Sequence, residues 1–325
     1  MILIVAEALS PKSITTAVEA LSSAQTLSSQ CGCPITAVIL AADEAAGQAA
    51  VSQLGAHGCS NVTIATHPTL GSYQPQAYAA ALAEVMTAKQ AKVVLVAATS
   101  TGSDYAPRVA FKTGSGFISQ AQSLTWENNA LTAIKAGVAE SLLMTQTVQG
   151  GSTAVVTLRP KTFEAPAATG ASATVDTLAL ALNGLNPGSQ WVSTTPEAAT
   201  RVKLEEADVV VSGGRGLQSA ENFALVEQLA ETLGGAVGAT RAIVDAGWRP
   251  HSEQVGQTGK TVSPKLYVAV GISGAIQHLV GMRTSGTVVA INRDADAPLM
   301  KQADVAVVGD VLTVVPQLVA KLKGG

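Results

Sequence analysis

The 325-residue sequence predicts an α/β protein of two domains, an N-terminal domain with a mostly parallel sheet plus added antiparallel strands and a C-terminal doubly wound parallel sheet. The length suits about two domains. Apolar residues make up 47% of the chain, charged residues 13% and aromatic residues 3%, a composition that favours close packing of small side chains. Short apolar runs alternate with stretches of helical spacing, which is typical of parallel sheets covered by helices.

The first part of the chain alternates strand and helix signals. Apolar runs predict strands over Ile2–Ala6, Ile35–Ala41, Val62–Ala65 and Val93–Ala98. Helical spacing predicts helices over Ser13–Ser28, Glu44–Leu54 and Gln76–Ala88. From Ala121 to Thr177 the pattern changes to short β-rich runs, notably Thr153–Leu158 and Ser172–Leu178. We expect antiparallel strands there, which complete the first domain.

Breaker residues separate the two predicted domains. Asn186–Gly188 and Thr194–Glu197 are turn signals, and we place the boundary near Thr194–Thr200, giving domains over 1–194 and 195–325. Strand and helix signals then resume over Ala207–Val211, Asn222–Leu233, Leu266–Val270, Ala275–Val280, Thr287–Ile291, Val305–Val308 and Val311–Lys321. This alternation predicts a second doubly wound unit.

Composition and charge exclude several classes of function. The formal net charge is −3 without a long basic run, so no nucleic-acid partner is expected. No apolar run reaches the roughly 18 residues of a membrane span. The chain enters a strand-like run at Met1 without a signal region, which favours a bacterial cytoplasmic protein, or a mitochondrial matrix protein if the chain is processed. The cysteines Cys31, Cys33 and Cys59 are interpreted as reduced thiols, because no second pair completes a metal or redox site.

Polar and small residues follow two of the predicted strands in the second domain. The strand over Leu266–Val270 leads into a turn with Gly271, Ser273 and Gly274, and the next helix opens with Gln277 and His278. A second apolar run ends in Asn292. Strand carboxyl ends and helix N-termini form the ligand sites of open α/β sheets. The stretch therefore predicts a bound nucleotide.

Glycines and a cation follow an earlier strand of the same domain. After Ala207–Val211 the sequence continues Ser212-Gly213-Gly214-Arg215-Gly216. Glycines let backbone N–H groups approach a phosphate, and Arg215 adds an anion donor. The segment lacks the dinucleotide pattern G-x-G-x-x-G, which weighs against an ordinary NAD site. A plain glycine turn stays open as the alternative interpretation.

Two further segments carry polar groups toward the expected crevice, and the second of them suits a ring with alternating nitrogen and carbonyl atoms. Thr240 and Arg241 follow a short strand, although Arg241 is also spaced for a surface ion pair with Asp245. The polar segment Gln254–Thr261 contains Gln257 and Thr258, which can donate and accept hydrogen bonds, or it is a mobile hairpin tip.

His278 and Asp310 each allow two interpretations. His278 is either a satisfied core histidine or a ligand contact, and Asp310 either holds ribose hydroxyls or caps the last helix. Five such segments after strands of one domain favour a ligand site over five unrelated features. No nucleophile, metal cluster or acid–base pair is evident in the sequence.

Together these residues resemble the α subunit of electron transfer flavoproteins over nearly the whole chain. Leu266–His278 matches the family signature, and so do four later positions of the second domain. The segments around Arg215, Thr240-Arg241 and Gln254–Gly259 match in order and spacing. The four later positions are Gly281, Val288, Ala290 and Asn292, and Ala98–Gly102 with Asp104 and Ala106–Arg108 is similar in the first domain. Gln120 departs from the family, which often carries aspartate there.

The resemblance implies one FAD held by the C-terminal domain and a β subunit partner that carries AMP and contacts the N-terminal domain. It implies that the heterodimer carries electrons from dehydrogenases to an acceptor such as a membrane quinone oxidoreductase. The implied FAD-binding residues are Arg215, Thr240, Arg241, Gln254, Gln257, Thr258, Gly271, Ser273, Gly274, Gln277, His278, Asn292 and Asp310. A guanidinium at the flavin favours added negative charge, so Arg241 is expected to raise the reduction potential.

Two other functions remain open at the level of sequence. The chain could be a nucleotide-binding module of a larger complex that holds NAD or an adenylate without redox work, or a purely structural subunit. Flavin absorption in the purified heterodimer separates both from the carrier. The sequence does not identify the donor or the acceptor.

Overall fold

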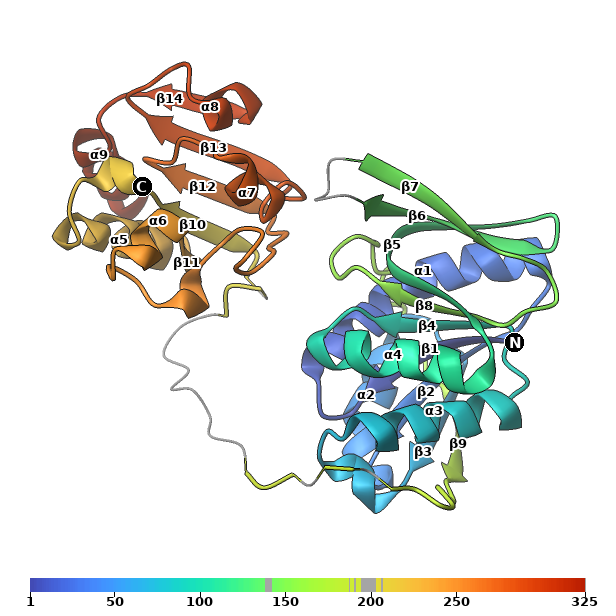
Figure 1. Ribbon diagram of the computed structural model, residues 1–325. Helices are drawn as coiled ribbons and strands as arrows, with labels where there is room; N and C mark the ends of the chain where they lie inside the picture. Colours follow the sequence, from blue (N-terminus) through green and yellow to red (C-terminus); the bar gives the residue numbers. More distant parts are fainter. Residues whose placement is uncertain (138–141, 187, 190, 194–202, 206, 325) are drawn as a thin grey trace. The chain divides into compact units, whose positions relative to one another are not determined.

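The computed structural model describes residues 1–137, 142–186, 188–189, 191–193, 203–205 and 207–324 (Figure 1). The chain divides into two compact units, Met1–Thr194 and Thr195–Gly325, each with its own sheet and core. The boundary expected at Thr194–Thr200 lies outside the described residues. Each unit is therefore considered by itself.

The N-terminal unit is built on a mixed nine-stranded sheet of order β7-β6-β5-β8-β4-β1-β2-β3-β9. Its strands are β1 (Ile2–Glu7), β2 (Ile35–Ala41), β3 (Asn61–Thr66), β4 (Val93–Ala97), β5 (Gly116–Glu127), β6 (Ala130–Gly137), β7 (Leu142–Val148), β8 (Ala154–Leu158) and β9 (Thr174–Ala179). Its helices are α1 (Pro11–Cys31), α2 (Glu44–Ala56), the 3-10 turn η1 (Pro68–Gly71), α3 (Pro75–Ala88) and α4 (Ser100–Thr113). A mostly parallel sheet with added antiparallel strands is confirmed.

The antiparallel strands differ from those expected. Among the described strands of this unit, only β5, β6 and β7 pair antiparallel, whereas β8 runs parallel to both β4 and β5, and β9 runs parallel to β3. The expectation of antiparallel strands at Thr153–Leu158 and Ser172–Leu178 was therefore wrong. All five residues of β8 are buried. Burial on both faces is typical of a parallel strand that lies between two neighbouring strands.

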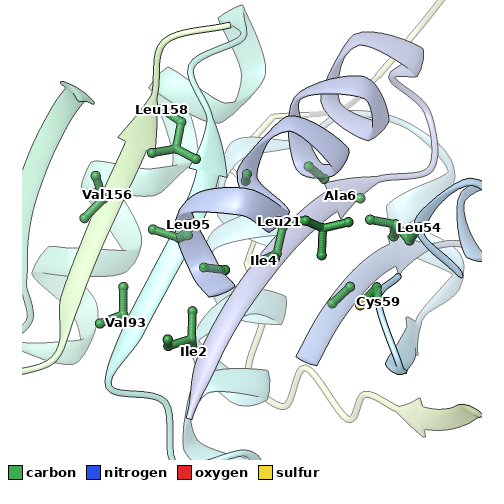
Figure 2. Packing of buried hydrophobic residues seen from close by; sticks show 14 of the residues in the cluster. Ile2, Ile4, Ala6, Leu21, Leu54, Cys59, Val93, Leu95, Val156 and Leu158 are labelled. Carbon is green, nitrogen blue, oxygen red and sulfur yellow. The ribbon is translucent and has the colours of Figure 1, made fainter. Parts of the chain in front are cut away.

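The core of the N-terminal unit lies on both faces of its sheet. Alternate side chains of β1 point to opposite faces, so Ile2 and Ile4 pack with α1 and α2 while Leu3 and Val5 pack toward α3 and α4. Figure 2 shows the core on the face covered by α1 and α2, where residues of β1, β4 and β8 lie in one cluster with Leu21 of α1. Burial of each such aliphatic side chain contributes about 1.5–3 kcal/mol.

The C-terminal unit is an all-parallel five-stranded sheet of order β11-β10-β12-β13-β14, which confirms the doubly wound class. Its strands are β10 (Val209–Gly213), β11 (Ala236–Ala239), β12 (Leu266–Val270), β13 (Thr287–Asn292) and β14 (Val305–Val308). Its helices are α5 (Ala224–Thr232), α6 (Arg241–Asp245), α7 (Ile276–Val280), α8 (Pro298–Gln302) and α9 (Val311–Gly324), with 3-10 turns η2 (Arg215–Leu217), η3 (Glu221–Phe223) and η4 (His251–Glu253).

The connections of the C-terminal sheet reverse direction at β10. The chain passes from β10 to β11 on one side and then to β12 on the other side of β10. The carboxyl ends of strands at such a reversal form a crevice in open α/β sheets, because the connecting helices leave on opposite faces. The geometry therefore locates a ligand site before any side chain is considered. Within the described part of the chain, every helix is too short or too polar to cross a membrane.

Candidate functional site

A pocket of about 380 Å³ lies where β10, β11 and β12 end, a volume within the usual range of small-molecule sites. Gly214 and Arg215 follow β10, Thr240 and Arg241 follow β11, and Gly271 follows β12. The lining residues are Gly214, Arg215, Thr240, Arg241, Ala242, Asp245, Gln254, Val255, Gly256, Gln257, Thr258, Gly271, Ile272, Ser273, Gly274, Ala275, Gln277 and His278. The structure thus brings together every predicted site residue except Asn292 and Asp310.

Two glycine-containing turns interlock at one side of the pocket. The backbone N–H of Gly214 donates to the carbonyl of Val270 (2.9 Å), and that of Gly216 donates to the carbonyl of Gly271 (3.0 Å). A Cβ at Gly216 would lie 2.6 Å from the Cα of Gly271, and Gly271 itself has φ of 65°. Only glycine permits this approach. The N–H groups of Gly214 and Gly216 are thus used within the protein, so these glycines serve the close approach of the two turns, and a phosphate cradle at this segment stays a prediction.

Two arginines bring positive charge to the pocket. Arg215 is exposed, and across the described ranges its side chain has no ion-pair or hydrogen-bond partner. Arg241 pairs through Nε with Asp245 at 3.2 Å, with side-chain exposures of 67% and 63%. Both interpretations of Arg241 therefore hold, since it lines the pocket and also forms the surface pair. An exposed pair of this kind contributes about 0–1 kcal/mol, so a bound anion can compete for the guanidinium.

The segment that carries Gln257 and Thr258 is fixed at both sides of the pocket. The N–H of Val255 donates to the carbonyl of Ala239 in β11 (2.9 Å), and the N–H of Gln257 donates to the carbonyl of Gln277 in α7 (2.7 Å). The buried amide of Gln254 donates to Thr258 Oγ1 (3.0 Å). Residues 254–260 therefore form one wall of the pocket, fixed by backbone hydrogen bonds, and are not a free hairpin tip. The side chains of Gln257 and Thr258 stay exposed.

An ion-pair cluster supports the start of this wall. Arg249 contacts Glu253 of η4 (2.6 Å) and Glu227 of α5 (2.9 Å), and its guanidinium lies 4.8 Å from the ring centroid of Phe223. Hydrogen bonding and charge from Glu253 raise the pKa of Arg249 despite partial burial. Since η4 directly precedes Gln254, this cluster joins the wall to the rest of the unit.

His278 lies in the pocket wall but is satisfied within the protein. Its Nε2 lies 2.9 Å from the hydroxyl of Tyr267, and its Nδ1 lies 3.1 Å from the carbonyl oxygen of Val255. Burial lowers the pKa of His278 to about 4, against a smaller opposing effect of the Val255 carbonyl. The imidazole is therefore neutral at pH 7. Of the two interpretations, the satisfied histidine is observed, and a contact of His278 with a ligand stays a prediction.

Asn292 and Asp310 lie at the ends of β13 and β14, outside the residues that line the pocket. Asn292 donates through Nδ2 to the carbonyl of Ile272 (3.0 Å), and so joins β13 to the turn after β12. Asp310 accepts from the N–H of Leu312 (2.9 Å), so the capping interpretation is observed. Their contact with the adenosine end of a cofactor stays a prediction.

Sequence reasoning left two kinds of site residue out. Asp245 was predicted only as a partner of Arg241, and Val255 and Ile272 were not predicted as site residues, yet all three line the pocket. Tyr267 was assigned to a buried strand, where it does lie, but its hydroxyl contacts His278. No local pattern pairs residues 267 and 278, because only the packing of α7 on β12 brings them together.

Fold and pocket define an α/β nucleotide-binding protein whose site suits a large anionic cofactor with a polar ring. The residues present fit FAD in chemistry, since glycine turns and arginines suit a pyrophosphate, and amide and hydroxyl groups suit the flavin edge. A family model described as "Electron transfer flavoprotein FAD-binding domain" matches residues 203–283, which include every residue of the pocket. A second, "Electron transfer flavoprotein domain", matches residues 2–183.

Relatives extend the match over nearly the whole chain. The electron transfer flavoprotein subunit alpha of Thermoanaerobacterium thermosaccharolyticum is 37% identical over 98% of this chain and 97% of its own length. That of Mycobacterium leprae is 40% identical over 84% of both chains, and that of Paracoccus denitrificans is 52% identical over 52% of this chain and 54% of its own. The chain belongs to the electron transfer flavoprotein alpha-subunit family and carries its FAD-binding domain.

Proposed function

We propose that the chain binds FAD in the pocket at the ends of β10, β11 and β12 and carries electrons from flavoprotein dehydrogenases to a downstream acceptor, such as a membrane quinone oxidoreductase. The observation that carries the proposal is the meeting of glycine turns, two arginines and a hydrogen-bonding wall at the reversal of the sheet. FAD supplies the electron chemistry when bound. The chain's residues bind it, orient it and set its electrostatic surroundings.

Position in the pocket supports separate roles for the residues. Arg215 and Ser273, with Gly271 and Gly274, suit the pyrophosphate because they combine a cation, a hydroxyl and pocket-lining positions without a side chain. The other predicted residues that line the pocket are proposed to face the isoalloxazine ring, and the two predicted residues at the ends of β13 and β14 are proposed to face the adenosine end. The first group is Thr240, Arg241, Gln254, Gln257, Thr258, Gln277 and His278, and the second is Asn292 and Asp310.

A β subunit that carries AMP is proposed as the partner, with the N-terminal unit, residues 1–194, in contact with it. Exposed apolar side chains support such a contact, because Leu142, Leu143 and Met144 of β7 are exposed by 57%, 73% and 47%. Contiguous exposed apolar residues are typical of surfaces that another protein covers. The named relatives are bacterial, which supports a cytoplasmic location for the pair.

The reduction potential of the bound flavin tests this function. Purified heterodimer is expected to show flavin absorption that bleaches on reduction, whereas a colourless heterodimer after FAD addition would overturn the proposal. Replacement of Arg241 by Ala should lower the potential by on the order of 60 mV per electron, because a positive charge beside the ring favours the reduced form. Arg241→Lys should retain part of the effect, and Arg293→Ala, an exposed cation outside the pocket, should have none. An unchanged potential in Arg241→Ala excludes the role of Arg241.

A further inference from the structure

The hydrogen bonds of His278 fix which of its nitrogens carries the proton. A carbonyl oxygen can only accept, so Nδ1, at 3.1 Å from the oxygen of Val255, must carry hydrogen. The ring is neutral at pH 7, because burial holds its pKa at about 4. Nε2 therefore has a free lone pair, and the hydroxyl of Tyr267 at 2.9 Å must donate to it. Burial also raises the pKa of Tyr267, so the phenol keeps the proton that it donates.

These three groups come from three different segments of the C-terminal unit. Tyr267 lies in β12 and is fully buried, His278 lies in α7, and Val255 belongs to the wall that carries Gln257 and Thr258. A second bond, from the N–H of Gln257 to the carbonyl of Gln277, joins the same helix to the same wall at 2.7 Å. Hydrogen bonds therefore run from Tyr267 in the central strand through His278 to Val255 in the pocket wall.

The geometry points to Tyr267 as a positioning residue for the FAD site, which holds His278 as the neutral Nδ1–H tautomer and through it fixes the wall of Gln257 and Thr258. Tyr267 is not among the residues that line the pocket, so it acts through His278. Its ring alone does not explain the arrangement, because phenylalanine would fill the same volume without a donor. The relevance to FAD depends on the proposed function, whereas the tautomer of His278 does not.

Nitrogen NMR of the heterodimer, measured with and without added FAD, tests the tautomer directly. With ¹⁵N-histidine only in this chain, the four histidines give four ring pairs, and His278→Gln assigns one of them. The result expected at pH 7 is a protonated Nδ1 and an unprotonated Nε2 for His278. The opposite tautomer, or a cationic ring, would overturn the proposal without any variant of Tyr267.

Replacement of Tyr267 by Phe tests the positioning role. The neutral imidazole then loses the hydroxyl that donates to its Nε2. The Nε2-protonated form should therefore gain population, and the pKa of His278 should rise. Loss of one buried hydrogen bond should also weaken FAD binding roughly tenfold. Tyr78→Phe is the matched control, because Tyr78 is a buried phenol that donates to the carbonyl of Leu70 in the other unit.

The outcomes separate this proposal from the proposed function. If Tyr267→Phe leaves the nitrogen shifts and titration of His278 unchanged, Tyr267 has no positioning role, even if FAD binds normally to both proteins. If the wild-type heterodimer binds no FAD while His278 shows the expected tautomer, the proposed function is wrong and the contact of Tyr267 with His278 stands.

Discussion

Acidification should destabilise the C-terminal unit through His278. The pKa of this histidine is lowered from 6.5 to about 4 on folding, since burial opposes the charge. The unfolded chain therefore binds a proton more readily than the folded chain between these values. Stability from the neutral ring is complete above pH 6.5 and is lost as pH falls toward 4. Linkage with these two values gives a loss of about 2.5 kcal/mol between pH 7.5 and pH 4.5.

Hydrogen exchange of peptides from residues 254–260 and 276–282 measures this loss, once intrinsic exchange rates are corrected for pH. Other groups titrate over the same range, so the quantity of interest is the pH dependence of wild type minus that of His278→Gln. This difference should grow to about 2.5 kcal/mol at low pH. His251→Gln, at an exposed position outside the pocket, is the control. Parallel pH profiles for wild type and His278→Gln would refute the buried neutral histidine.

Three further substitutions test other parts of the structure. Gly216→Ala should destabilise the C-terminal unit by about 1–3 kcal/mol in thermal unfolding and reduce FAD retention, because the added Cβ would meet the backbone of Gly271. Gly324→Ala is the control and should have neither effect, because open space surrounds that position. Burial raises the pKa of Glu7, against hydroxyl hydrogen bonds that lower it, so the stability contributed by its protonated carboxyl is present below pH 4.5 and is lost as pH rises. The unfolding free energy of wild type relative to that of Glu7→Gln should therefore fall as pH increases. A difference that does not change with pH contradicts this prediction. Arg249→Ala should destabilise by about 3 kcal/mol and speed hydrogen exchange at 254–260, and unaltered exchange there would exclude its support of the wall.

Much of the fold was predictable because its signals are local. Apolar runs such as Val93–Ala98 and Leu266–Val270 are long enough to identify buried strands, and Gly271 marks a turn that needs positive φ. The pairing direction of β8 was not predictable in this way. An apolar run identifies a strand, but its neighbours are set by the path of the chain, and Ala154–Leu158 inserts between β4 and β5 from a distant position.

The candidate site was predictable as far as it follows strand ends. Arg215, Thr240 and Ser273 come directly after strands, and parallel strands bring such residues to one edge of the sheet. The contact between Tyr267 and His278 could not be read in this way, because it depends on the packing of α7. The role of Asp310 could not be predicted either, because a carboxylate that precedes a helix gives the same sequence pattern whether it caps the helix or binds a ligand.

The structure of the heterodimer with FAD bound tests the central claim most directly, which is that the pocket at the reversal of the C-terminal sheet holds the flavin. The account predicts the isoalloxazine ring between Arg241 and the wall of Gln257 and Thr258, with the pyrophosphate at Arg215 and the turn after β12. Flavin bound elsewhere, with this pocket filled by protein or by solvent alone, would contradict it.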